Sequence, residues 1–146
     1  MKEYISEKFI HNELARRAEE GLAGLYRAWK KRKRVDPFII TWPSDTLHTE
    51  SGTPIEGPCL LELPPDDKKS WRKLMIESVR FTGAYGIVFV EQRENDVQAT
   101  FETRHGAKCW TMPIVRSGDV DILKEPVITV DREHLGLLWQ KSGGTN

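Results

Sequence analysis

The sequence predicts an α+β fold in which a long N-terminal helix and a second helix pack on an antiparallel β-meander of about four to six strands. Three patterns carry this prediction. Apolar residues recur at helical spacing up to about residue 34 and again from Trp71 to Val79. Residues 84–90 then run almost without a polar side chain, as in a strand covered on both faces. Residues 97–102 alternate between apolar and polar, which is typical of a half-exposed strand.

The first helix is predicted from Ser6 to about Arg34, with Ser6 as its N-cap. Gly21 and Gly24 each weaken its middle by about 1 kcal/mol relative to alanine. At about 1.5 Å per residue the helix would be about 42 Å long, so we expect its apolar end to extend past a domain of this size. One stripe of the helix is apolar: Phe9, Ile10, Leu14, Ala18, Leu22, Leu25, Tyr26 and Trp29.

The second helix is predicted to follow Pro64 and Pro65, which hold the backbone extended. Asp66 or Asp67 is expected to cap its first amides, and Gly83 to end it in a left-handed conformation. The predicted strands are residues 38–42, 59–63, 84–90, 97–102, 108–112, 120–123 and 127–130.

Proline and glycine place the remaining boundaries. Pro43 ends the first strand, residues 44–58 form a long loop, and Pro113 is expected to block the ladder of the strand before it. Asp131 is a candidate cap for a short final helix through 135–139, with a strand as the alternative. The chain therefore divides into a helix with a basic end (1–36), a single α+β domain (37–141) and a loose tail (142–146).

Composition favours a cytoplasmic protein with no membrane contact. The chain of 146 residues has no apolar run of transmembrane length, and its first residues lack the apolar centre of a signal peptide. Two cysteines, Cys59 and Cys109, do not make a disulfide framework, which favours a reducing compartment.

Charge is balanced overall but unevenly distributed. Residues 1–36 carry ten Lys or Arg against six Asp or Glu, a balance of +4, and residues 37–146 carry twelve against sixteen, a balance of −4. The positive charge gathers in a basic run, defined as Lys30, Lys31, Arg32, Lys33 and Arg34. A solvated helix end explains such a run, because cations favour the negative pole of the helix dipole. With Trp29 beside it, the run is also the candidate site for an acidic protein partner or a nucleic acid.

The clearest candidate for chemistry is Glu102, His105 and Cys109 around one predicted turn. A Glu-x-x-His pair can bind a metal, and a cysteine beside a histidine can act as a nucleophile. The spacing favours a polar hairpin tip instead, since residues flanking a turn need not point the same way and no second Cys/His pair follows. No catalytic residue, metal site or cofactor is therefore predicted.

Two other chemical patterns are weaker. Glu77, Asp96, Glu102 and Arg104 superficially follow the metal-dependent PD-(D/E)xK nuclease pattern, but Arg104 stands where that pattern has lysine. Asp96 and Glu102 are also about 20 Å apart in an extended chain. The long loop offers a further polar set: Asp45, His48 and Glu50.

The central third of the chain resembles small uncharacterised proteins of phage and mobile-element genomes. The resemblance runs through 84–92, Phe101-Glu102, His105-Gly106, Trp110 and Pro113-Ile114. It implies a short bacterial or viral accessory protein that acts by binding, and it brings no known activity or site.

These observations lead to one main function and two alternatives. The main hypothesis is a non-enzymatic accessory protein that binds another protein, or self-associates as a homo-oligomer, through its N-terminal helix. The first alternative is a nucleic-acid-associated protein that uses the basic run. The second is a small hydrolase or ligand-binding domain with a site near Glu102 and His105.

Overall fold

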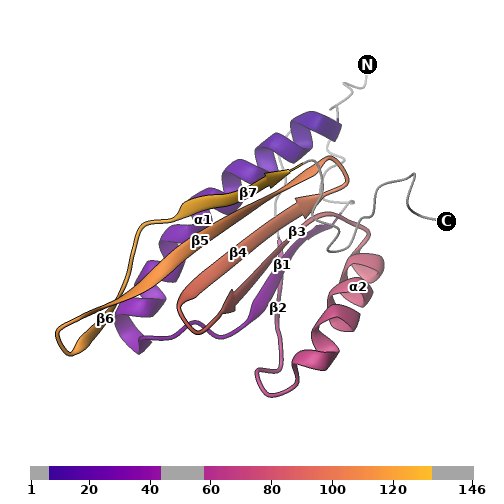
Figure 1. Ribbon diagram of the computed structural model, residues 1–146. Helices are drawn as coiled ribbons and strands as arrows, with labels where there is room; N and C mark the ends of the chain where they lie inside the picture. The colour runs from indigo at the N-terminus through magenta and orange to yellow at the C-terminus, as the bar shows by residue number, and fades with distance from the viewer. Residues whose placement is uncertain (1–6, 44–57, 133–146) are drawn as a thin grey trace.

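The computed structural model describes residues 7–43 and 58–132 and is shown as a ribbon in Figure 1. Its elements in chain order are α1 (Glu7–Arg32), β1 (Phe38–Pro43), β2 (Cys59–Glu62), a 3₁₀ turn η2 (Lys68–Ser70), α2 (Trp71–Thr82), β3 (Ala84–Gln92), β4 (Asp96–Thr103), β5 (Gly106–Ser117), β6 (Val120–Leu123) and β7 (Val127–Arg132). The predicted α+β class, with two helices on an antiparallel sheet, is confirmed.

All the strands belong to one antiparallel sheet that has a helix on each face (Figure 1). The strand order is β2-β1-β3-β4-β5-β6, and β7 pairs with the first half of β5 while β6 pairs with its second half. Helix α1 covers one face over β3 and β4, and α2 covers the other face over β1 and β3. The layers are therefore helix, sheet and helix, with the second helix over one side of the sheet.

Helix α1 is continuous through Gly21 and Gly24, and its apolar stripe is buried against the sheet from Ile10 to Trp29. Leu14 is fully buried, and Trp29 is 4% exposed. The expectation of an overhanging apolar end is therefore wrong. The helix shares one hydrophobic core with strands β3, β4 and β5.

The end of α1 is covered because the β5–β6 hairpin reaches its last turns. The indole N–H of Trp29 donates to the carbonyl oxygen of Asp121 at 3.0 Å. The hydroxyl of Tyr26 donates to the carbonyl oxygen of Lys124 at 2.5 Å. These two hydrogen bonds join segments that are far apart in the sequence, so the length of the helix alone could not indicate them.

Helix α2 ends as predicted but begins differently. Gly83 takes the left-handed conformation, with φ 60° and ψ 42°. Its N–H points to the carbonyl oxygens of Val79 and Arg80 in the last turn of α2. The capping role expected of Asp66 or Asp67 is wrong, because α2 starts at Trp71 with Ser70 before it and neither Ser70 nor Asp67 makes a side-chain cap. The Ser70 hydroxyl donates instead to the Asp67 carbonyl oxygen at 2.9 Å, which stabilises the 3₁₀ turn.

A second, smaller core lies between α2 and the sheet. Trp71 and Met75 of α2 pack on Ile39 of β1 and on Ile87 and Phe89 of β3. The rings of Trp71 and Phe89 meet edge to face, with centroids 5.8 Å apart. Strand β3 is therefore apolar on both faces because it is covered by a helix on both faces, as its sequence predicts.

Strand β5 is longer than predicted, because Pro113 does not end it. Pro113 lies opposite Asp96, the first residue of β4, and pairing with β6 begins at Ile114. The missing proline N–H thus falls where β5 exchanges one partner strand for another. Beyond this point the β5–β6 hairpin projects from the sheet as a two-stranded ribbon (Figure 1).

Some predictions lie outside the described residues. They are the Ser6 cap, nearly all of the 44–58 loop, the final helix through 135–139 and the 142–146 tail.

Candidate interaction surface

The basic run is exposed at the end of α1, whereas Trp29 is not. Arg32 and Arg34 each lie 3.4 Å from a carboxylate oxygen of Asp36, so two of the five cations are partly neutralised. Within the described residues no carboxylate lies in ion-pair reach of the three lysines of the run. Trp29 is a core residue whose N–H is already bonded, so it offers no stacking surface beside the run.

The surroundings of the basic run carry charges of both signs. The backbone N–H of Val35 donates to the Gln92 side-chain oxygen at 2.7 Å, which sets the α1–β1 connection beside the β3–β4 turn. In that turn Arg93 and Asp96 form two parallel hydrogen bonds of 2.8 and 2.9 Å. The side-chain hydrogen bond from Arg93 holds the pKa of Asp96 below its usual range. This end of the molecule is therefore a mosaic of ion pairs rather than a uniform positive field.

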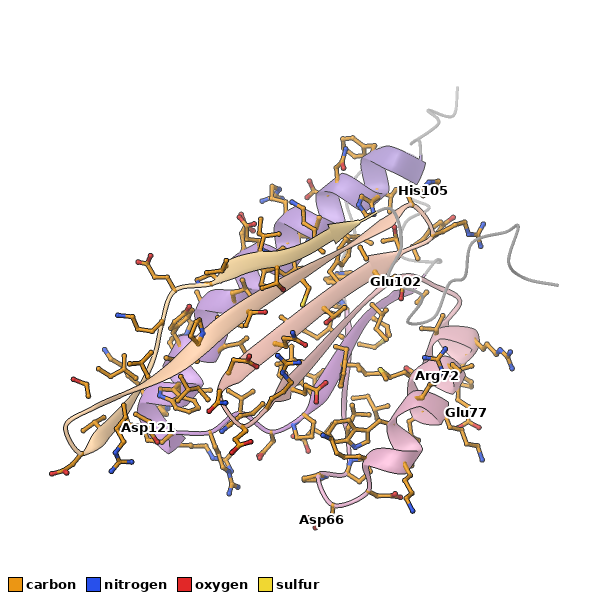
Figure 2. The ribbon with its side chains drawn as sticks, in the orientation of Figure 1. Asp66, Arg72, Glu77, Glu102, His105 and Asp121 are labelled. Carbon is orange, nitrogen blue, oxygen red and sulfur yellow. The ribbon has the colours of Figure 1, made fainter. Side chains whose placement is uncertain are left out.

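The structure separates Glu102, His105 and Cys109. Glu102 is fully buried and Cys109 is buried, and both point to the face of the sheet that carries α2. His105 is exposed in the β4–β5 turn, and its backbone N–H donates at 3.0 Å to the hydroxyl of Thr103, which points to the opposite face. Figure 2 shows His105 at the turn and Glu102 on the sheet below it. Glu102 and His105 therefore do not converge on a common site.

The residues that superficially follow the PD-(D/E)xK nuclease pattern are also dispersed. Glu77 is exposed on α2, and Glu102 lies on the sheet (Figure 2). Asp96 begins β4, whereas Glu102 lies next to its last residue. Asp96 is held by Arg93 across the β3–β4 turn. Among residues 7–43 and 58–132, no three His, Cys, Asp or Glu side chains gather closely enough to hold a metal. The loop residues Asp45, His48 and Glu50 lie outside these ranges.

Exposed apolar side chains gather on the β5–β6 hairpin. Val115 is 45% exposed, Val120 47% and Ile122 42%, and we call these three residues the hairpin patch. Val115 lies directly opposite Ile122, and Val120 lies opposite Ser117, so all three point to the same side of the ribbon. That side is turned away from α1, because the alternate residues Ile114 and Leu123 pack with the α1 core.

Sequence reasoning predicted a strand at 120–123 but did not identify this patch. The available signal was that Ile114-Val115 and Ile122-Leu123 are apolar on both faces of short, paired strands. Such a pattern predicts cover on both sides. The sequence does not show that α1 covers one side and that α2, which packs on β1 and β3, leaves the other open.

Comparison with known proteins adds no further identification. No protein-family model, curated protein or solved structure matches this chain. Among the helices of the described residues, none combines the length and the apolar character needed to cross a membrane. The two cysteines, Cys59 on β2 and Cys109 on β5, are not in disulfides.

Proposed function

We propose that this chain is a non-enzymatic accessory protein that acts by binding protein, and in the first place by binding a second copy of itself. The observation that carries the proposal is the gathering of exposed β-branched residues on the projecting hairpin. Singly scattered apolar residues are normal on a protein surface, whereas exposed apolar residues that gather in one place often mark a protein contact. A cytoplasmic location, with both cysteines unpaired, belongs to the same proposal.

The N-terminal helix contributes to this function in a different way from the one expected. Its apolar stripe is already covered by the sheet, so it supplies support rather than the contact itself. The hydrogen bonds from Trp29 and Tyr26 fix the hairpin and the segment after it on the last turns of α1. A helix that holds a projecting ribbon in one position reduces the ordering cost of a partner contact.

Sedimentation velocity of the full chain across a wide concentration range tests this proposal. We expect the mass to rise from the monomer's 16.8 kDa toward twice that value as concentration increases. The rise should change little between low and high salt, because burial of apolar surface is not screened. A mass of 16.8 kDa at every concentration would contradict the proposal.

Nucleic-acid binding is a second candidate, favoured by the exposed cations of the basic run. Two of them share Asp36, so about three phosphates are expected to be neutralised, giving a slope near −3 for log K against log[salt]. Titration of a labelled DNA duplex at several salt concentrations measures this slope. Replacing Lys30, Lys31 and Lys33 with glutamine should abolish binding, whereas replacing Arg16 and Arg17 on the same helix should not. Binding that is absent at low salt would exclude this candidate.

A further inference from the structure

The β5–β6 ribbon, residues 114–125, is bounded by a proline at each end. Strand β4 stops pairing with β5 at Pro113, and β7 begins to pair with β5 at Val127, directly after Pro126. A proline has no backbone N–H to donate to a ladder. Among the described residues, the two strands of the ribbon therefore pair with each other and with no other strand.

The ribbon is attached to α1 by one of its faces. The indole N–H of Trp29 and the hydroxyl of Tyr26 donate to the ribbon's carbonyl oxygens at Asp121 and Lys124. On the same face, Leu123 is buried in the core that α1 shares with the sheet. The ribbon therefore lies over the last turns of α1, where Trp29 is buried beside the basic run.

The ribbon is less buried than the centre of the sheet. At its base the N–H of Ile114 donates to the carbonyl oxygen of Asn95 in the β3–β4 turn at 2.9 Å. The hairpin patch on its outer face is exposed, whereas β3 is buried between two helices. Segments with few buried apolar contacts open at a lower free energy than the core of a protein. We therefore expect the ribbon to open at a lower free energy than β3 and β4.

We propose that the ribbon is a strap that detaches from α1 as one unit, while the rest of the sheet stays folded, and that it uncovers Trp29. Pro113 and Pro126 mark the two joints at which the strap separates from the sheet. Because a two-stranded hairpin by itself is marginally stable in water, the detached strap also loses its own ladder. Trp29 and Tyr26 are then exposed next to the basic run, so the open protein has an aromatic and basic surface that the closed protein does not offer.

Native-state hydrogen exchange followed by NMR tests the strap, at a protein concentration at which the chain is monomeric. In the wild type, the amides of residues 115–123 and the indole N–H of Trp29 should exchange together, with protection at least about ten-fold lower than that of β3 and β4. Ile87→Val removes a methyl group from a fully buried side chain in the core between α2 and the sheet. It should speed the exchange of β3 and β4 amides roughly five-fold and leave the strap unchanged, because this core stays packed while the strap is open.

Trp29→Phe is the complementary variant, since it removes the hydrogen bond to Asp121 that is broken whenever the strap detaches. It should speed the exchange of the strap amides roughly five-fold. If Trp29→Phe does not fold, Tyr26→Phe takes its place, because it loses the hydrogen bond to Lys124 and keeps the ring.

Two results would overturn the strap. Strap amides that have the same protection as β3 and β4, or that respond to Ile87→Val, would show that the ribbon opens only when the whole protein unfolds. A Trp29 indole N–H that exchanges with the amides of β3 rather than with those of the strap would show that opening does not uncover Trp29.

Discussion

At the scale of single residues, Gly86 is a position of close packing, where α1 passes over β3. A Cβ atom added at Gly86 would lie 2.9 Å from Leu14 Cδ1 and 3.2 Å from Thr103 Cγ2. Leu14 is fully buried and has little room to move. We therefore expect Gly86→Ala to lower the free energy of unfolding by about 1–3 kcal/mol in urea titration.

Gly21→Ala is the control for that change, since a Cβ at Gly21 meets nothing within 4 Å. Gly21 lies inside α1, so alanine there should raise the stability by roughly 0.5–1 kcal/mol through helix propensity. If both variants shifted stability in the same direction, close packing at Gly86 would not be the cause.

Lys33 is the non-glycine residue with a positive φ in the described chain, at 55°. It follows the last turn of α1, and its N–H donates to the Trp29 carbonyl oxygen at 2.8 Å. Glycine is favoured in this position because a Cβ crowds the left-handed conformation. We expect Lys33→Gly to stabilise the protein by about 0.5–1 kcal/mol.

The same substitution two residues earlier should have the opposite effect. Lys31 lies within α1, where glycine costs about 1 kcal/mol of helix propensity. Thermal melts of Lys33→Gly and Lys31→Gly should therefore move in opposite directions, although each variant removes one positive charge from the basic run. A lower melting temperature for Lys33→Gly would show that the left-handed conformation is not strained.

At the scale of elements, the ion pair in the β3–β4 turn makes the free energy of unfolding depend on pH. Arg93 donates two hydrogen bonds to Asp96 and lowers the pKa of that carboxyl below its ordinary value of 3.8. A carboxyl whose pKa is lower in the folded state contributes stability above its ordinary pKa, and this stability is lost as the pH falls below 3.8 and through the folded value. The pair is partly solvated, so we expect a contribution of about 1 kcal/mol or less.

Asp96→Asn should remove this contribution, and the difference in stability from the wild type should be full at neutral pH and vanish under acid conditions. Arg93→Gln should remove the same pH dependence, because either substitution abolishes one ion pair. Urea titrations at several pH values measure this difference. A difference that persists unchanged to low pH would show that the ion pair is not its source.

The elements that were predictable from sequence are those whose pattern is local. Residues 84–90 read as a doubly covered strand because both helices pack on β3, and Gly83 ends α2 because its backbone must be left-handed there. The predictions that failed depended on distant partners. Pro113 does not end β5, because β6 replaces β4 at that residue, and periodicity carries no information about that exchange.

At the scale of the whole molecule, the same distinction applies to the candidate site. The basic run was predictable because charge density is local, whereas Trp29 beside it is buried by a hairpin some ninety positions away in the chain (Trp29 to Asp121, a separation of 92). The exposure of Val115 and Ile122 depends on where two helices lie on the sheet. A strand sequence therefore shows which side chains are apolar, but the tertiary arrangement decides which of them are buried.

In the whole molecule, Trp29 links the N-terminal helix α1 to the β5–β6 hairpin through its hydrogen bond to Asp121. Trp29→Phe removes the hydrogen bond to Asp121, and Trp110→Phe makes the same chemical change in the same core. Among the described residues, the buried indole N–H of Trp110 meets no acceptor. Trp29→Phe should therefore cost about 1 kcal/mol more stability than Trp110→Phe in urea titration.

Self-association should respond in the same order, because the hydrogen bond from Trp29 holds the ribbon that carries Val115 and Ile122. If the loss of about 1 kcal/mol is also lost from the free energy of association, the dissociation constant of the Trp29→Phe dimer should rise roughly five-fold in sedimentation. The dimer of Trp110→Phe should keep its strength, since β5 at that residue is held by β4 and β7 rather than by α1 alone. Equal stability losses in the two variants, with equal dissociation constants, would mean that α1 does not position the hairpin and that the helix serves the core alone.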